Sequence, residues 1–376
     1  MRRINRMGAC VCALALSGVS LGVSADVSIG MSNALTGSAS GLGTGMKAGS
    51  GAFFQKVNAA GGVNGHKINM ISYDDGYEPD RAAAMTDKLV NEDKVLALFG
   101  YVGTPTAKAA VPTAQKAGVP FFAPFTGAEF LRNPVNPIVF NIRASYFDET
   151  EGLVDHFIND LGHKSVGIFI QDDAYGEAGK GGVNKALHKR NLSLVGEGRY
   201  KRNSDDVGAG LAALKTANPE VVIMVGTYKA CAAFVKAAHA SGFNPKFANL
   251  SFVGTSDFIK EAGKDGEGVY ISQVVPSPKD ASVGIVKQYQ ADMKAAGNAD
   301  LNYTSLEGYI AAVTFAEALK KVSGTPSRES IAKAIDTLDM DLGNFRVKFS
   351  AADHQGSKQV YFTQVRSGEA VPVSKF

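Results

Sequence analysis

FGYVGTPTAKAA, residues 99–110, contains a strand end, a loop and a helix start, and it is the clearest indication of the fold. The apolar run VLALF before it predicts a strand, and Thr104 and Pro105 suit the N-cap and the first turn of a helix. Ligands of open α/β sheets bind beyond the carboxyl ends of strands, where helix N-termini point. A helix cap without a ligand is the alternative. The loop residues expected at a ligand site are Tyr101, Gly103 and Thr104.

A second copy of this unit follows later in the chain, as MVGTYKACAAF over residues 224–234. APFTG at 123–127 then corresponds to LSFVG at 250–254, since each has a central Phe and a Gly two residues later. The spacing from Gly103 to Gly127 is 24 positions, and from Gly226 to Gly254 it is 28. Two similar lobes facing each other would place both loop pairs on one cleft. The further residues expected there are Phe125, Thr126, Gly127, Tyr228 and Phe252.

Strands and helices alternate along most of the chain. Examples are the strand INMISYDD, the helix over 79–91 with Pro in its first turn, and the strands SVGIFI and EVVIMV. Alternation with short connections predicts parallel sheets covered by helices on both faces. We therefore predict two α/β lobes, one over 26–144 and 276–345 and the other over 145–275 and 346–376.

The first 25 residues have the pattern of a secretory signal peptide: three arginines, a short apolar core and Val-Ser-Ala before a cut after Ala25. A membrane anchor is the alternative, but the apolar run is short for a span. Removing this leader takes away three of 39 basic residues and none of 36 acidic ones, which leaves a formally neutral chain. The mature chain therefore has no excess of basic charge that would predict a nucleic-acid partner. Only Cys231 would remain, so no intramolecular disulfide is expected.

Enzymatic and metal motifs are missing from the mature sequence, because the GxSxG match at Gly18, Ser20 and Gly22 lies in the leader. The six histidines form no HExxH, DDAYGE lacks calcium-loop spacing, GLGTG lacks the third glycine of a dinucleotide loop, and there is no GxxxxGK[ST]. No nucleophile and base pattern stands out. We expect a binding protein with no metal, no cofactor and no catalytic residue.

The mature chain resembles the type I periplasmic solute-binding proteins of ABC transporters, the group that includes leucine/isoleucine/valine-binding proteins. The resemblance lies in GMSNALTGSASGLGTGMKAG, VNAAGGVNGHKINMISYDDGYEPDRA, VPFFAPFTGAEFLR, FNIRASYFDETEGLVDHF and DDAYGEAGKGGV. It implies two Rossmann-like lobes with parallel-rich sheets joined by three crossovers, a monomer that closes over a ligand in the periplasm, and delivery to a membrane permease.

The resemblance also assigns roles to individual residues. Thr104 and the backbone of 125–127 would hold a ligand carboxylate, and Tyr228 would close over the ligand from the second lobe. Tyr175 would lie at a helix start beside the cleft, and Leu42 would line the pocket.

One departure concerns the acidic side chain that pairs with the ammonium in the family's amino-acid binders. Its place here reads Ser251-Phe252-Val253, and a buried ammonium without an anion is costly. Either another acid replaces it, or the ligand is an aromatic or aliphatic acid. Glu307 is one candidate acid, although TSLE also predicts a capping box of Thr304 with Glu307. Glu129, Asp172 and Asp173 are further candidates. A sensor subunit and, less favoured, an exported enzyme are the alternative functions.

Overall fold

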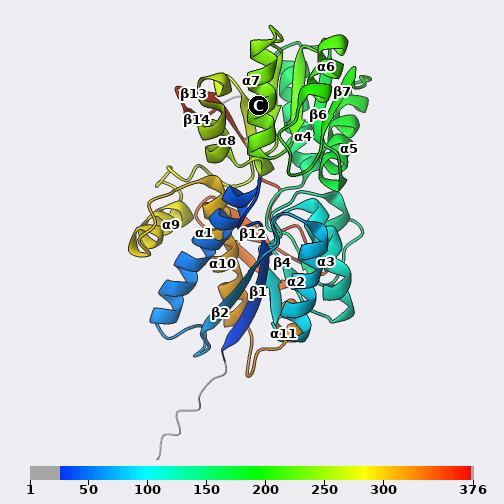
Figure 1. The fold of residues 1–376 in the computed structure, drawn as a ribbon. Coiled ribbons are helices and arrows are strands. Elements are labelled where there is room, and N and C mark those ends of the chain that lie inside the picture. The colour runs from blue at the N-terminus through cyan, green and yellow to red at the C-terminus, as the bar shows by residue number, and fades with distance from the viewer. Residues whose placement is uncertain (1–25, 374–376) are drawn as a thin grey trace, which may run out of the picture.

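The computed structural model describes residues 26–373, which form two α/β lobes stacked end to end (Figure 1). The predicted leader, 1–25, lies outside the described residues. The first lobe holds the N-terminal strands and the helices of the 284–335 region, and the second lobe holds the middle of the chain.

The first lobe is built on a parallel sheet of order β2-β1-β3-β4-β5. The inner strands β1, β3 and β4 are buried, because helices cover both faces of the sheet. One apolar core lies under α1 and α10, and another lies under α2 and α3. The strands are β1 (Val27–Asn33), β2 (Ile68–Asp74), β3 (Ala97–Phe99), β4 (Phe121–Phe122) and β5 (Val139–Phe140).

The second lobe has a sheet of order β14-β13-β10-β9-β8-β6-β7, in which β13 and β14 run antiparallel. The strand β13 pairs with β10, so a C-terminal segment returns to complete this lobe. The strands are β6 (Val166–Gln171), β7 (Gly196–Tyr200), β8 (Val221–Val225), β9 (Lys246–Asn249), β10 (Tyr270–Gln273), β13 (Tyr361–Arg366) and β14 (Glu369–Pro372).

Helices connect and cover the strands (Figure 1). In the first lobe they are α1 (Ser40–Ala59), α2 (Pro79–Asn91), α3 (Thr104–Lys116), α9 (Gly284–Ala295), α10 (Tyr303–Lys320) and α11 (Arg328–Ile335). In the second lobe they are α4 (Tyr146–Asp155), α5 (Ala174–His188), α6 (Gly208–Ala217), α7 (Tyr228–Ala240) and α8 (Thr255–Ala262). Short helical turns are η1 (Glu129–Leu131), η2 (His156–Asp160), η3 (Ser251–Val253) and η4 (Gly263–Gly266).

The predicted fold class is confirmed: two α/β lobes with parallel-rich sheets, joined by three crossovers. The third crossover differs from the prediction. A hairpin of β11 (Asp339–Asp341) and β12 (Arg346–Lys348) packs Val347 and Phe349 into the first-lobe core. Asn141 also pairs with Gln355. The segment 346–355 therefore belongs with the first lobe. The third crossover lies between this segment and β13, and not at residue 346 as predicted.

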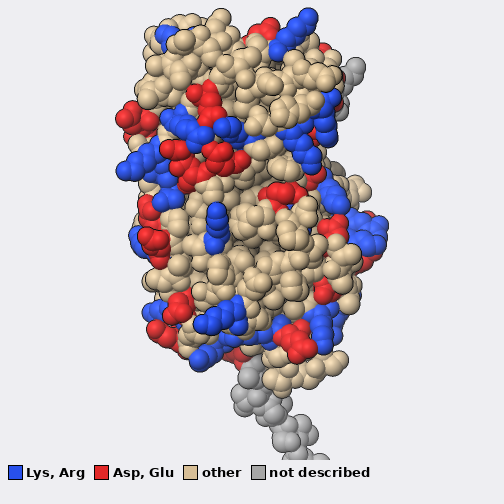
Figure 2. Space-filling model, turned by 90° about the vertical axis from the view of Figure 1, so that its right-hand side faces the viewer, with Lys and Arg blue, Asp and Glu red and all other residues tan. Residues whose placement is uncertain are grey.

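Charges of both signs are mixed over the face shown in Figure 2, with no extended area of one sign. Within residues 26–373, no helix combines the length and apolar character that crossing a membrane requires.

Candidate ligand-binding site between the lobes

The two predicted loop pairs meet where the lobes face each other. Phe125, after β4 in the first lobe, lies 5.5 Å from Phe252, after β9 in the second lobe, measured between ring centroids. Tyr175, at the start of α5, packs 4.5 Å from Phe252. All three side chains are buried, and they share one apolar cluster that spans both lobes. The carboxyl ends of the two sheets thus form a single aromatic site.

Two threonines of the first lobe line the same region. The hydroxyl oxygens of Thr104 and Thr126 are 2.6 Å apart in a buried hydrogen bond, and Thr126 donates to the Tyr146 hydroxyl at 3.3 Å. Gly127 lies against Tyr146, where a Cβ atom would come within 2.5 Å of the ring. The structure therefore brings Thr104, Thr126 and Gly127 together beside the start of α4.

Two details of the first loop differ from the prediction. Tyr101 lies outside the cleft: its hydroxyl is hydrogen-bonded to Thr86 at 2.9 Å and its ring packs 4.9 Å from Phe121, under α2 and α3. Side chains alternate along an extended segment, so Tyr101 faces the core. Thr104 is the first residue of α3, and Gly103 takes the N-cap position with φ +109°. A Cβ atom at position 103 would lie 2.4 Å from the ring of Tyr77, so glycine is required there.

Arg143 is the main site residue that the sequence reasoning missed. It lies on the first crossover, and its guanidinium is fully buried 4.5 Å above the ring of Phe125. Its Nε is 3.4 Å from Glu307 Oε1, and its Nη2 donates to the Ser251 hydroxyl. One buried arginine therefore contacts both lobes.

Glu149 of α4 supplies a carboxylate at the position where the sequence shows no acid. Its Oε2 accepts from the backbone N–H of Ser251 at 2.8 Å and from the Ser272 hydroxyl at 2.6 Å. The sequence contained one signal for these two residues. In NIRASYFDE, residues 141–149, Arg143 and Glu149 lie six positions apart, where a strand end is followed by a helix.

Glu307 does not cap a helix, contrary to the capping-box prediction. The helix α10 begins two residues earlier than that box requires, and its capping box is formed by Asn302 and Ser305. Glu307 instead faces Arg143 from within the helix. Burial raises the pKa of the Glu307 carboxyl to about 7, although Arg143 opposes the shift.

The other candidate acids are held by their own lobe. Asp173 caps α5, accepting from the backbone N–H of Tyr175 at 2.9 Å. Asp172 pairs with Arg199 at 2.7 Å on the surface. Glu129 lies in the turn η1, half-buried.

Several buried polar atoms at this junction have no hydrogen-bond partner among the described residues. They include Arg143 Nη1, the Tyr175 hydroxyl and Glu149 Oε1. Buried polar groups are almost always paired, and an unpaired one costs about 1–3 kcal/mol. Their presence on residues around Phe252 marks the junction as a place for a polar ligand group.

Leu42 and Tyr228 are buried in the apolar cluster between the lobes and join them. The Tyr228 hydroxyl accepts from the backbone N–H of Gly41 at 3.3 Å, linking α7 to α1. Leu42 reaches Gly254, where a Cβ atom would come within 2.6 Å of its side chain. Gly254 has φ +77°, so it both turns the second loop and leaves room for Leu42.

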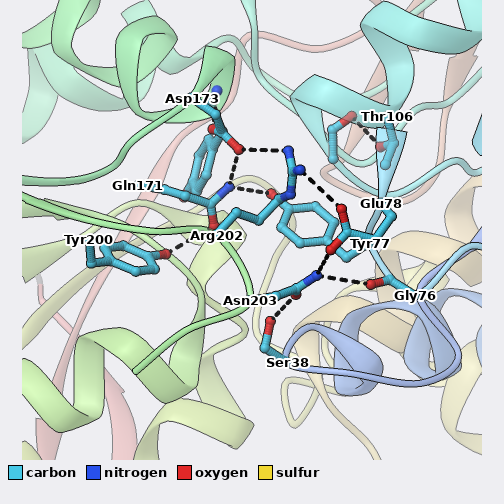
Figure 3. Close-up of polar contacts among 12 residues, drawn as sticks. Ser38, Gly76, Tyr77, Glu78, Thr106, Gln171, Asp173, Tyr200, Arg202 and Asn203 are labelled. Carbon is cyan, nitrogen blue, oxygen red and sulfur yellow. Dashed lines mark hydrogen bonds and ion pairs between the residues drawn. The ribbon is translucent and has the colours of Figure 1, made fainter. Parts of the chain in front are cut away.

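A contact at the rim joins the loop after β7 to the first lobe (Figure 3). Arg202 pairs with Glu78 at 3.0 Å and with Asp173 at 3.3 Å. Asn203 donates to the carbonyl of Gly76 at 3.2 Å. We call this set of residues, Gly76, Glu78, Asp173, Arg202 and Asn203, the rim latch.

Beneath the rim latch, a chain of buried hydrogen bonds runs from the first lobe into the second (Figure 3). Gln171 donates to the Tyr77 hydroxyl at 3.2 Å and accepts from the Tyr200 hydroxyl at 3.0 Å. The backbone N–H of Thr227 donates to Tyr200 in turn. The contact between the lobes is therefore hydrogen-bonded as well as apolar.

The family model for periplasmic binding proteins matches residues 26–370. The chain belongs to the periplasmic binding protein family. A possible leucine/isoleucine/valine-binding protein from Rhodopirellula baltica has the same fold, with a TM-score of 0.89 and 36% identity over 94% of this chain and 97% of that one.

Among curated periplasmic binding relatives, an amino acid binding protein of Pseudomonas aeruginosa is 26% identical over 212 residues. That alignment spans 56% of each chain, so only about half of that relative is matched. The leucine-, isoleucine-, valine-, threonine- and alanine-binding protein of the same organism is 25% identical over 303 residues, 79% of each chain.

Membership of this family establishes a periplasmic solute-binding protein rather than an enzyme. Within residues 26–373, no group of three or more His, Cys, Asp or Glu side chains is arranged to hold a metal ion. The candidate site consists of packed aromatic rings with a few charged and hydroxyl groups.

Proposed function

We propose that this protein captures a small carboxylate-bearing solute between its lobes and delivers it to the membrane subunits of an ABC transporter. The single observation that carries the ligand class is Arg143, a fully buried cation whose Nη1 has no hydrogen-bond partner among the described residues. A carboxylate is the natural partner of a guanidinium fork. The Tyr175 hydroxyl is a second unpartnered donor beside it.

The body of the solute would be apolar, because Phe125, Tyr175 and Phe252 surround this point. We favour an aromatic or aliphatic acid without an ammonium group. Glu307 is already paired with Arg143, and the loop 251–253 has no acidic side chain. The ligand would then rest its ring or alkyl chain on the aromatic side chains and direct its carboxylate to Arg143, with Thr104 and Thr126 alongside.

An α-amino acid is the second candidate, favoured by the unpartnered Glu149 Oε1, which is the kind of group an ammonium needs. Proteins of this fold are known in complex with either ligand class. A branched-chain amino acid transporter protein from Streptococcus pneumoniae carries isoleucine, and a solute-binding protein from R. palustris carries benzoate, each 21% identical to this chain.

The decisive experiment compares matched ligands by thermal shift and calorimetry. We would use benzoate, 4-methylpentanoate, leucine and phenylalanine, because 4-methylpentanoate is leucine without its ammonium. A ligand that binds only the folded state raises the melting temperature of the protein. We expect the two simple acids to stabilise the protein and the two amino acids to have little effect. Stabilisation by leucine alone would assign the second candidate class instead.

Tyr175→Phe and Tyr101→Phe form a matched pair for the same assay. Each removes one buried tyrosine hydroxyl, but only that of Tyr175 lies at the site. Acid binding should weaken in Tyr175→Phe and stay unchanged in Tyr101→Phe. Equal effects would argue against the assigned position of the ligand.

The transport role has its own tests. The leader should be removed after Ala25, so N-terminal sequencing of the periplasmic protein should begin at Asp26. Deleting the gene should abolish high-affinity uptake of the bound acid, whereas retained uptake with a lost chemotactic or regulatory response would indicate a sensor.

A further inference from the structure

We propose that Arg143 is shared between two carboxylates: Glu307 holds it in the absence of ligand, and the solute's carboxylate replaces Glu307 on binding, while Glu307 takes up a proton. This inference rests on the proposed acid-binding function and adds a proton to the binding reaction. It makes Glu307 a positioning residue for Arg143.

The contacts of Arg143 show why one anion can replace the other. The nitrogen Nη2 is used by the Ser251 hydroxyl, and Nη1 has no partner among the described residues. The nitrogen Nε contacts Glu307 Oε1 at 3.4 Å, an ion pair without hydrogen-bond geometry. Glu307 therefore neutralises the guanidinium but does not occupy its donors, and a ligand carboxylate that meets Nη1 directly would make the stronger contact.

The charges around Glu307 show why a proton must follow. The ionisable groups that face Glu307 are Arg143 on the crossover, Arg132 after η1 and Glu149 of α4. Together with Glu307 itself, these groups carry two positive and two negative charges. Arg132 donates from its two Nη atoms to the carbonyls of Ala128, Thr126 and Arg143, so it fixes the loop, and only its Nε has no partner among the described residues.

A bound carboxylate would add an uncompensated negative charge to this buried set, which is costly. Glu149 Oε2 accepts two hydrogen bonds, from the N–H of Ser251 and the hydroxyl of Ser272. Glu307 has no such donor and loses its cation when the ligand arrives. It is therefore the group that becomes neutral.

The direction of the pH dependence follows from this exchange. The pKa of Glu307 is about 7 while Arg143 is its partner. Once the ligand takes Arg143 and adds a nearby negative charge, that pKa rises further. At a pH between the pKa of Glu307 without ligand and its pKa with ligand, binding takes up a proton. The affinity for the acid therefore falls as pH rises above 7, by up to about tenfold per pH unit. Below pH 6 Glu307 is already protonated, and affinity becomes independent of pH.

The test is calorimetry with benzoate and with 4-methylpentanoate at pH 6 and pH 8, each in two buffers of different ionisation enthalpy. We expect no proton uptake at pH 6 and a large fraction of one proton at pH 8. Glu307→Gln imitates the protonated side chain, so it should bind the acid at pH 8 as tightly as wild type does at pH 6, without proton uptake.

Asp257→Asn is the matched control. Burial raises the pKa of Asp257 to about 6, but this residue makes no ion pair with Arg143. The Asp257→Asn variant should keep the proton uptake of the wild type. Acid binding with no uptake at pH 8, or uptake that persists in Glu307→Gln, would overturn the exchange and leave the acid-binding function standing. If neither acid binds at pH 6 or pH 8, the proposed acid ligand itself is wrong, and the exchange falls with it.

Discussion

Arg202 of the second lobe and Glu78 of the first lobe form an ion pair across the rim of the cleft, with Nη2 and Oε2 3.0 Å apart. Their backbones belong to different lobes, so this contact exists only when the lobes meet. Neither residue lies among the aromatic rings. The rim latch therefore contributes to closure without selecting the ligand.

Arg202→Ala should weaken binding of every ligand by a similar factor. The pair is partly exposed, and such ion pairs contribute about 0.2–1 kcal/mol, which corresponds to a Kd higher by a factor of about 1.4 to 5. The difference from wild type should shrink at high salt, because salt screens exposed charges. Calorimetry at low and high salt measures both effects.

Arg199→Ala is the control for the rim latch. Arg199 pairs with Asp172, Glu177 and Glu197, all in the second lobe. Its loss should leave ligand affinity unchanged. If both arginine variants bind alike, closure does not depend on Arg202.

Thr104→Val should weaken acid binding by about 1 kcal/mol while the fold is retained. The substitution keeps the side-chain shape but removes the hydroxyl that pairs with Thr126, and a typical hydrogen bond contributes about that much. Thr113→Val, on the same helix α3 but near its far end, is the control. Unchanged affinity in Thr104→Val would remove Thr104 from the site.

Phe252→Leu should change the preference among acids. Phe252 packs against Phe125, Tyr175 and Tyr77, and aromatic pairs add about 0.5–1.5 kcal/mol beyond the area they bury. Benzoate should lose more affinity than 4-methylpentanoate. The measured quantity is the ratio of the two Kd values, and an unchanged ratio would place the ligand's body away from Phe252.

Glu307→Gln should also alter how stability depends on pH without ligand. Because the folded pKa is raised to about 7 from an ordinary value near 4.5, the folded wild type binds more protons than the unfolded chain in this interval. Stability contributed by the protonated Glu307 is therefore fully present below about pH 4.5 and is lost as pH rises toward 7.

The wild type should lose on the order of 2–3 kcal/mol over this interval relative to Glu307→Gln. Urea denaturation at several pH values measures that difference. Curves that stay parallel between pH 4.5 and 7.5 would show that Glu307 ionises normally in the folded protein.

The architecture of the two lobes, and the sheet ends where a ligand would bind, could be predicted from local sequence patterns. Alternating apolar strands and helices are local patterns, and their period follows from backbone geometry within a few residues. The repeated unit of strand, glycine-threonine loop and helix placed Thr104, Phe125 and Phe252 at corresponding strand ends, and the structure brings these residues together.

The charged groups that meet between the lobes could not be predicted, because the folded chain brings them together from distant positions. Arg143 and Glu307 are 164 positions apart, and Glu149 and Ser251 are 102 apart, so no local pattern pairs them. Glu307 even satisfied a local capping pattern that the fold does not use, because α10 starts two residues earlier, at Tyr303. The side of the chain to which Tyr101 points was likewise set by packing under α2 and α3. Strand and helix preferences act over neighbouring residues, whereas buried charges are paired only by the crossovers that bring distant segments together.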